Sequence, residues 1–350
     1  MTEIEIGNSK FFRNGRTMVI AEIGVNHDGS PQRALELVQV AGECGADAVK
    51  LQLFHADRLM HESSKFADYQ KRSQNEGSPI EMLRRYELKD EDLARVVREV
   101  QKLGMIPLAT PFSPQDVDQI VALDLPAIKI ASPDVVNWPL LQHAAASGLP
   151  LLVSTGAANI NEVTSSVAWL RGWGTAFALL HCISSYPTPA ADANLCWIAE
   201  LTERFGVPVG FSDHTTEVIA GALAVAAGAM FVEKHLTYDR QAVGPDHAAS
   251  LDPDHFANYV SLVRVAGQMR GRGSKRVLDI ERDVRTVSRQ SLVAARDLPR
   301  GHLLTARDLI VQRPGTGIPA SAMPSVVGQR ITHSIKAGQM LDWQTLSHAA

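Results

Sequence analysis

The sequence predicts an α/β fold in which a (β/α)8 barrel is followed by a small, mainly β domain. Short apolar runs alternate with helical patterns eight times between residues 18 and 270, which is the repeat of a (β/α)8 barrel. The runs lack strict polar alternation, and this is typical of parallel strands that are buried on both faces. The alternative is a doubly wound open sheet, which is disfavoured because no GxGxxG motif follows the first run.

The predicted elements follow one another in a regular order. A helix begins at Ser30–Pro31, because serine is a common N-cap and proline suits the first helical position. Residues 55–89 are polar and irregular, and loops of this length are usually lids or binding loops. Strands are expected at residues 18–21, 46–54, 105–110, 127–131, 150–155, 176–183, 207–213 and 229–236. Further helices are expected at 90–103, after Pro114, at 139–147, 161–170, 194–205 and 253–269, and between the last two strands.

The domain organisation follows from a change in composition after residue 270. Residues 1–270 form the predicted barrel, and the highly charged residues 271–288 form a linker or, alternatively, an extended surface helix. Residues 289–350 consist of short β runs and turns, in which RDLPRGHLLT and HSIKAGQMLD repeat one pattern. A β domain of this size is marginally stable, so we expect it to lean on the barrel or on another subunit.

Composition excludes several classes of protein. The net charge is −4 without long runs of either sign, which argues against nucleic acid and membrane surfaces as partners. The three cysteines form no CxxC motif, so we expect neither a disulfide framework nor a zinc knuckle, in keeping with a reducing cytosol. The first 15 residues lack the apolar core of a signal peptide, and the apolar run 218–232 is too short to span a membrane. We therefore expect a cytoplasmic protein.

Two histidines end the last two predicted strands, His214 after VPVGFSD and His235 within AMFVEKHL. Because adjacent parallel strands end at the same rim of a sheet, both imidazoles are expected at that rim. Two neutral imidazoles that converge at one rim form a plausible divalent-metal site. The alternatives are a helix-capping turn at His214 and a hydrogen-bonded core histidine at His235.

Two lysines, Lys50 and Lys129, lie inside otherwise apolar strands, although lysine is almost never fully buried unless it is paired. One interpretation is an internal salt bridge to Glu22, Asp134 or Glu233. A second is a binding site for a phosphate dianion, and a third is a lysine that forms a Schiff base. The dianion site is favoured because hydroxyl donors flank the two basic strands, namely Thr110, Ser132 and Ser212.

Two loops at the same rim also carry polar groups. Asp246, in Gly244-Pro245-Asp246-His247, either accepts hydrogen bonds from sugar hydroxyls or is a solvated residue of a Gly-Pro turn. Tyr186-Pro187 begins a rigid loop after the sixth strand. The active site of a (β/α)8 barrel lies at the carboxyl ends of its strands, so this rim is the expected active site.

Several phrases together resemble the sialic acid (N-acetylneuraminate) synthases. These are AEIGVNHDGS, GADAVKLQ, ATPF, KIAS, STG, LLHC with YPTP, GFSDHT, EKHLT and GPDHAASL, in this order between residues 21 and 251. The tail resembles the antifreeze-protein-like (SAF) domain of that family through SLVAARDLPRG and QRPGTGI. The resemblance covers nearly the whole chain, and the ordered set of phrases is specific.

The resemblance implies a transferase that condenses phosphoenolpyruvate with open-chain N-acetylmannosamine, giving a nine-carbon 2-keto acid and phosphate. His214 and His235 would bind Mn2+ or Mg2+, and Glu22 would act catalytically between the two substrates. In a domain-swapped homodimer, Arg313 would reach the N-acyl group in the partner's site. The phosphate and carboxylate would be held by Lys50, Thr110, Lys129, Ser132 and Ser212, and the sugar by Gln52, Tyr186 and Asp246.

The chain departs from the family pattern at two places. KIASPD stands where the family commonly has KIGSGE or KIPSGE, so that Asp134 replaces a glutamate and Pro133 a glycine. Ser184 replaces a common asparagine after LLHC. Both Asp134 and Ser184 remain candidate substrate-binding residues, and the departures bear on which sugar is used.

Three alternatives to the condensation of phosphoenolpyruvate with N-acetylmannosamine remain open. The first keeps the reaction and uses a 2,4-diacetamido-2,4,6-trideoxyhexose, giving legionaminate or pseudaminate. Its methyl group would favour an apolar lining from segment 55–89, where Leu59, Met60 and Phe66 are candidates. The others are a lysine-imine aldolase that uses Lys129, and a sugar-binding module without turnover.

Overall fold

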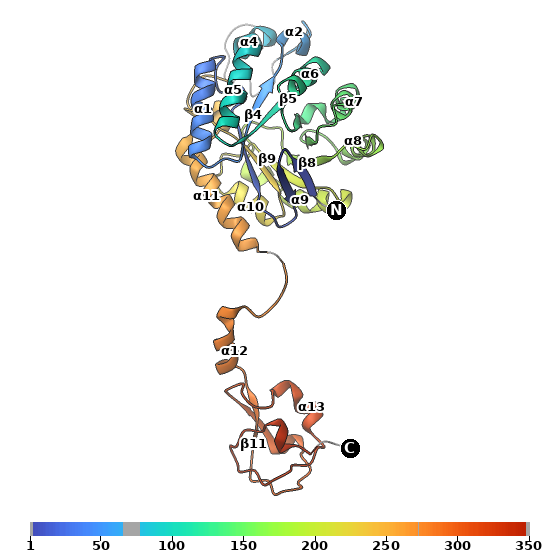
Figure 1. Ribbon diagram of the computed structural model, residues 1–350, viewed down its shortest axis with the longest axis vertical. Coiled ribbons are helices and arrows are strands. Elements are labelled where there is room, and N and C mark those ends of the chain that lie inside the picture. Colours follow the sequence, from blue (N-terminus) through green and yellow to red (C-terminus); the bar gives the residue numbers. More distant parts are fainter. Residues whose placement is uncertain (1–2, 66–77, 272, 348–350) are drawn as a thin grey trace. The chain divides into compact units, whose positions relative to one another are not determined.

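The computed structural model describes residues 3–65, 78–271 and 273–347. Its contacts divide the chain into two compact units, residues 1–273 and 274–350. Within the described residues, no helix combines the length and the hydropathy that crossing a bilayer requires. Figure 1 shows the first unit as a ring of helices around a sheet.

Eight parallel strands in the described part of the chain close into a barrel, which confirms the predicted fold class. Each strand pairs with its neighbours in sequence, and the last strand pairs in parallel with the first through His235 and Glu22. The strands are β3 (Met18–Glu22), β4 (Ala48–Leu53), β5 (Ile106–Pro111), β6 (Ile128–Ile130), β7 (Leu151–Ser154), β8 (Phe177–Cys182), β9 (Val209–Asp213) and β10 (Phe231–His235).

An outer ring of helices covers these strands and buries one continuous apolar core against them. The first helix starts where the sequence predicts, because the Ser30 side chain accepts a hydrogen bond from the backbone of Arg33 and Pro31 follows the cap. The ring consists of α1 (Pro31–Glu43), α5 (Asp90–Lys102), α6 (Pro114–Ala122), α7 (Trp138–Ala146), α8 (Ile160–Gly172), α9 (Cys196–Phe205), α10 (Ala220–Ala226) and α11 (Pro253–Arg270).

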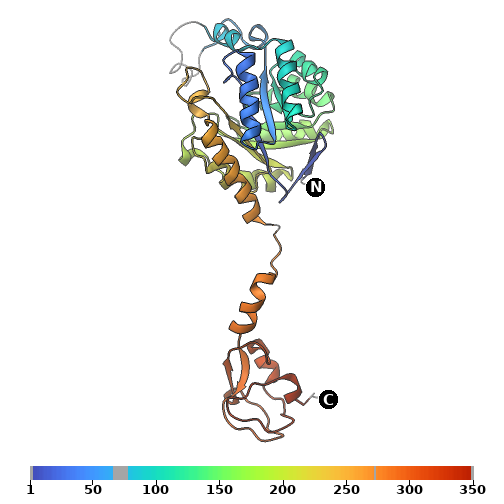
Figure 2. The same ribbon diagram turned by 60° about the vertical axis from the view of Figure 1, so that its left-hand side comes forward.

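A hairpin that the sequence analysis did not predict closes the amino-terminal end of the barrel. It consists of the antiparallel strands β1 (Glu3–Ile6) and β2 (Ser9–Phe12). Ile4, Ile6 and Phe11 are buried against the first residues of the barrel strands, including Met18 and Phe231. Figure 2 shows the hairpin, in dark blue, at the end of the barrel opposite the loops that carry polar residues.

In its described residues, 55–65 and 78–89, the segment that was expected to be irregular contains the helices α2 (Ala56–Leu59) and α4 (Pro79–Tyr86). That expectation was wrong for α4, because Ser78 and Glu81 form a capping box around Pro79, which nucleates a helix. Residues 66–77 lie outside the described part. Two side chains of α4, Met82 and Leu83, lie at the carboxyl-terminal end of the barrel.

The second unit is built around its own small apolar core. It contains α12 (Arg282–Ser288), the antiparallel pair β11 (Ser291–Ala294) and β12 (Leu309–Gln312), and α13 (Met323–Val326). The two repeated sequence phrases pair with each other, since Leu298 and Ile335 exchange backbone hydrogen bonds. This arrangement agrees with the predicted small, mainly β domain.

Candidate functional site

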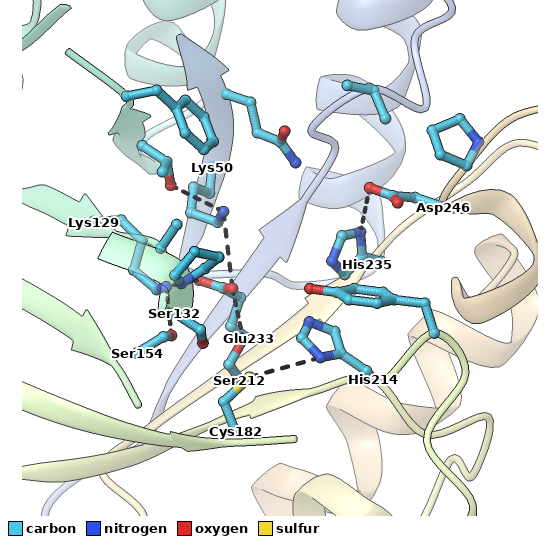
Figure 3. Close-up of a pocket in the computed structure, with 18 of the residues that line it drawn as sticks. Lys50, Lys129, Ser132, Ser154, Cys182, Ser212, His214, Glu233, His235 and Asp246 are labelled. Atoms are coloured by element: carbon cyan, nitrogen blue, oxygen red, sulfur yellow. Dashed lines mark hydrogen bonds and ion pairs between the residues drawn. The ribbon is translucent and has the colours of Figure 1, made fainter. Parts of the chain in front are cut away.

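A cavity of about 210 Å³ opens at the carboxyl-terminal end of the barrel. The strands place it there because their last inward-facing side chains converge at this end. Figure 3 shows the two lysines on one side, the two histidines on the other, and Glu233 between them. The lining residues from the strands are Lys50, Gln52, Thr110, Lys129, Ser154, Cys182, Ser212, Glu233 and His235.

The lysines and two glutamates form a buried network of charges. Lys50 Nζ lies 2.5 Å from Glu22 Oε2 and 3.8 Å from Glu233 Oε1. Lys129 Nζ lies 3.8 Å from the other oxygen of Glu233. Ser212 Oγ donates a hydrogen bond to Glu233 Oε1 at 2.9 Å. The internal salt bridges considered from the sequence are thus present, and both lysines nevertheless line the cavity.

Hydroxyl groups accompany both ammonium groups. Lys50 Nζ donates to Thr110 Oγ1 at 3.2 Å, and Lys129 Nζ donates to Ser154 Oγ at 2.6 Å. Ser132 lines the same side of the cavity and accepts a hydrogen bond from the Gly156 backbone at 3.0 Å. Ammonium and hydroxyl donors on one wall suit an anion such as a phosphate or a carboxylate.

The network shifts the proton affinities of its members in different directions. Burial, reinforced by Glu233, raises the pKa of Glu22 even though Lys50 opposes the shift. Burial lowers the pKa of Lys129, which has Glu233 as its main counter-charge. Burial also disfavours the charged form of Lys50, but Glu22 and Glu233 outweigh burial and raise its pKa. Lys50 therefore holds its proton more firmly than Lys129 does.

His214 and His235 face each other across the opposite side of the cavity, with ring centroids 5.4 Å apart. The ring of Tyr186 stacks at a tilt beside His214, at 4.1 Å between centroids. His214 Nδ1 lies 2.9 Å from the carbonyl oxygen of Ile183, which directs the other ring nitrogen away from that strand. His235 Nδ1 is buried without a hydrogen-bond partner and lies 3.6 Å from Asp246 Oδ2.

The two imidazoles differ in proton affinity. Burial and the positive charge of His214 lower the pKa of His235 well below its usual value, so His235 is neutral. Burial opposes the charged form of His214, but the Cys182 sulfur and the Ile183 carbonyl outweigh burial and raise its pKa. A cation that bound both rings would therefore displace a proton from His214.

The donor set fits an open cation site better than a closed one. The two imidazoles face each other at the rim, and one buried ring nitrogen of His235, 3.6 Å from the Asp246 carboxylate, has no hydrogen-bond partner. Among residues 3–65, 78–271 and 273–347, no group of three or more histidine, cysteine or acidic side chains is placed so that it could hold a metal ion by itself. The residues fit a metal whose remaining ligands are substrate and water.

Glu22 lies beneath the cavity and is held in place by its neighbours. Its side chain is fully buried, and Gln52 Nε2 donates to Glu22 Oε1 at 3.1 Å. Gly24 has a φ of 22°, and a Cβ atom at this position would collide with the Glu22 carboxylate and with Gln52. Glycine is thus required at residue 24 for the carboxylate and the amide to meet.

An apolar wall closes one side of the cavity mouth. Met82 and Leu83 of α4 line the cavity together with Val25 and Phe112. Leu59 packs against this cluster without lining the cavity, Met60 is also absent from the lining, and Phe66 lies outside the described residues. Met82 and Leu83 were not predicted as site residues, because their segment is polar and was expected to be irregular. The phrase Ser78-Pro79-Ile80-Glu81 nevertheless indicates the start of a helix.

Besides Glu22, which lies beneath the cavity, three sequence-predicted site residues are not among those that line it. Asp134 is half-buried and accepts a hydrogen bond from Asn137 at 2.8 Å. Ser184 is exposed in the loop after β8, and Arg313 is an exposed residue of the second unit. The other predicted binding residues, Gln52, Thr110, Ser132, Tyr186, Ser212 and Asp246, all line it. Residues that the cavity adds to the predicted set are Glu233, Ser154 and Cys182.

Comparison with known proteins yields matches over both units. The NeuB family model matches residues 37–275, and the SAF domain model matches residues 289–347. N,N'-diacetyllegionaminic acid synthase of Legionella pneumophila is 40% identical over 332 residues, 93% of each chain. N-acetylneuraminate-9-phosphate synthase of Homo sapiens is 29% identical, with 91% of this chain and 89% of the relative covered.

A solved structure supports the same relationship. The N-acetylneuraminic acid (sialic acid) synthetase of Leptospira borgpetersenii, in complex with citrate, superposes with a TM-score of 0.74 and 31% identity. The match covers 81% of this chain and 95% of that chain.

Replacing Glu233 should show whether it acts as the internal counter-charge of the two lysines. Glu233→Gln leaves buried ammonium groups without this partner, so the free energy of unfolding should fall by about 3–5 kcal/mol in urea titrations. Inorganic phosphate should then raise the melting temperature of the variant more than that of the wild type. Ser212→Ala, which removes one hydrogen bond to the Glu233 carboxylate but keeps the carboxylate itself, is the control and should lower the free energy of unfolding by only about 1.5–3 kcal/mol. Equal phosphate shifts in variant and wild type would contradict this role.

Proposed function

The chain belongs to the NeuB family, and we propose that it condenses phosphoenolpyruvate with an N-acylated amino-sugar aldehyde. The products are a nine-carbon 2-keto acid and inorganic phosphate. The observation that carries this proposal is the division of one cavity into a wall of ammonium and hydroxyl donors and a facing pair of imidazoles. One side suits an anionic enol phosphate, and the other suits a cation that binds a carbonyl oxygen.

Phosphoenolpyruvate is proposed to bind on the lysine side. Lys50 and Lys129 hold its negative charges, and the hydroxyl groups of Thr110, Ser132 and Ser212 donate to the remaining oxygens. Lys129 can exchange its protein partner for the substrate more easily than Lys50 can, because one carboxylate lies near Lys129 whereas two lie near Lys50. The enol C3 is thereby held towards the centre of the cavity, within reach of an aldehyde on the histidine side.

The sugar is proposed to bind on the histidine side. Tyr186 and Asp246 line that part of the cavity, and Gln52 connects it to Glu22 through a hydrogen bond. A divalent ion, Mn2+ or Mg2+, held by His214 and His235 supplies Lewis acidity to the aldehyde oxygen when it is bound.

Glu22 is proposed to handle the proton of the water that completes the reaction. Attack of C3 on the aldehyde carbon turns the aldehyde oxygen into an alkoxide, which takes up a proton, and leaves positive charge at C2 of the enol phosphate. Water adds at C2 and gives up one proton, and the bond from C2 to the phosphate oxygen then breaks as the hydroxyl at C2 loses its proton and becomes the keto group. Burial raises the pKa of Glu22 from its usual value, so that its carboxylate is a stronger base than an exposed one. Lys50, at 2.5 Å, opposes this rise in pKa and so favours the ionised carboxylate, which is the form that accepts a proton.

The apolar wall supports the trideoxy sugar over N-acetylmannosamine, which was the first expectation from the sequence. With the aldehyde at the histidines, the far end of the open chain extends to the mouth, where Met82 and Leu83 lie. A methyl group fits this wall, whereas a terminal hydroxyl would be buried there against apolar atoms. The similarity to the Legionella relative supports the same choice, so we propose a 2,4-diacetamido-2,4,6-trideoxyhexose as substrate and legionaminate as the product class.

Phosphate release from phosphoenolpyruvate tests the reaction directly. Release should require both manganese and a sugar, and should be faster with the 2,4-diacetamido-trideoxyhexose than with N-acetylmannosamine. A chelator should abolish phosphate release, because neutral imidazoles cannot replace the divalent ion as the Lewis acid that polarises the aldehyde. Release without sugar would contradict the condensation.

The same assay separates the remaining alternatives. A lysine-imine aldolase would be trapped by borohydride with pyruvate at Lys129 and would keep its activity in chelator. A binding module would bind the sugar without releasing phosphate.

The apolar wall gives a prediction about sugar preference. Met82→Gln should lower kcat/KM for the trideoxy sugar by about tenfold, because a polar group replaces the surface that packs against the methyl. The loss with N-acetylmannosamine should be smaller. Met269→Gln, at a residue 82% exposed on α11, is the matched control and should leave both values unchanged. A proportional loss for both sugars would show that Met82 does not read the methyl group.

The second unit is proposed to complete the site of another subunit in a domain-swapped homodimer, through Arg313 and the N-acyl group. Arg313→Ala and Lys129→Met should each be nearly inactive alone. Mixing the two chains should restore about a quarter of the wild-type activity, because half of the dimers are mixed and each has one intact site. Mixed dimers without activity would mean that Arg313 does not act across subunits.

A further inference from the structure

Two charged residues lie directly before the two histidines of the cavity. Asp213 precedes His214 at the end of β9, and Lys234 precedes His235 in β10. Because side chains alternate along a strand, these two point away from the cavity, towards the surrounding helices. Both side chains are completely buried, with an exposed fraction of 0%. Neither residue lines the cavity, and the proposed reaction gives them no role.

The contacts of Lys234 connect the two strands at the level of the histidines. Its Nζ lies 3.5 Å from Asp213 Oδ2 and donates a hydrogen bond to the carbonyl oxygen of Thr215. The backbone N–H of Thr215 donates to Asp213 Oδ1 at 2.8 Å. Thr215 is the residue after His214, so both peptide groups of this turn are held. Lys234 thus ties β10 to the turn that carries His214.

The surrounding helices exclude water from this ion pair. Tyr259 of α11 is fully buried, and the centre of its ring lies 6.0 Å from Lys234 Nζ. Tyr259 fits there because α10 has a glycine opposite it: a Cβ atom on Gly221 would lie 2.5 Å from the Tyr259 hydroxyl. A buried ion pair in a dry site is weak evidence for stability but holds its groups in one arrangement.

We propose that Asp213 and Lys234 are positioning residues that fix His214 relative to His235, so that both imidazoles meet one divalent cation. This inference rests on the proposed metal-dependent function. His214 is already held on its other side by the Ile183 carbonyl, so the connection to Lys234 completes a two-sided support. The pairing also has an electrostatic purpose, because Asp213 neutralises an ammonium group that would otherwise repel a cation at the rim.

The test compares manganese binding by the wild-type chain and the double variant Asp213→Asn/Lys234→Met. The asparagine keeps an acceptor for the Thr215 N–H, and removal of both charges leaves no unpaired ion in the core. The bond to the Thr215 carbonyl is lost, so the manganese dissociation constant should rise about tenfold in a titration followed by electron paramagnetic resonance. The melting temperature of the metal-free chain is measured alongside.

A partly buried ion pair elsewhere in the same barrel supplies the control. Asp47 accepts a hydrogen bond from the backbone of Val19 and pairs with Arg264 at 2.7 Å, at the amino-terminal end of the strands. Asp47→Asn/Arg264→Met should lower the melting temperature and leave manganese binding unchanged. Asp213→Asn/Lys234→Gln, which keeps an N–H donor near Thr215 and retains a polar group, should recover part of the affinity.

The outcomes are distinct. Weaker manganese binding in the Lys234 variants, with unchanged binding in the control pair, supports the positioning role. Unchanged binding in folded Lys234 variants overturns it and leaves the proposed function intact. A wild-type chain that binds no manganese would overturn the metal site itself, and with it this inference.

Discussion

The structure depends on the neutralisation of two buried lysines at the centre of the barrel. The backbone positions of Lys50 and Lys129 are fixed, because each lies in a strand that is hydrogen-bonded to a neighbouring strand on both sides. Glu22 and Glu233 make their burial tolerable, and the hydroxyl groups around them satisfy the remaining donors. An anionic substrate that enters the cavity therefore meets a site whose charges are already arranged, so little reorganisation is needed when it binds.

Strands β9 and β10 use their two faces for different purposes. On the inner face, Ser212 is hydrogen-bonded to Glu233 and supports the lysines. On the outer face, Asp213 is paired with Lys234 beneath the helices. The register that aligns Ser212 with Glu233 also aligns Asp213 with Lys234. A shift of one residue would turn the charged pair into the cavity, so the same pairing that closes the barrel determines which groups reach the substrate.

The barrel and most of its rim could be predicted because both follow from local patterns. Eight apolar runs separated by helices define the strand order, and strand ends define the rim. The hairpin formed by residues 3–12 was missed because each of its strands is only four residues long, although Ile4 and Ile6 alternate with glutamates as they would in a strand. The partners of Lys50 and Lys129 also remained open, because a choice between salt bridge and ligand site depends on distances between strands. In the structure both lysines form ion pairs and also line the cavity.

The two departures from the family pattern at residues 133 and 134 differ in their position relative to the cavity. Asp134 lies outside the lining and is hydrogen-bonded to Asn137, so its shorter carboxylate changes the loop after β6 rather than the cavity surface. Pro133, its neighbour, does line the cavity, as do Met82 and Leu83 from a helix that the sequence analysis treated as a loop. The proposed preference for a trideoxy sugar therefore rests on the apolar residues at the mouth and not on the replaced carboxylate. A hydroxyl that met this wall would lose its hydrogen bonds to water without replacement, whereas a methyl group would lose none.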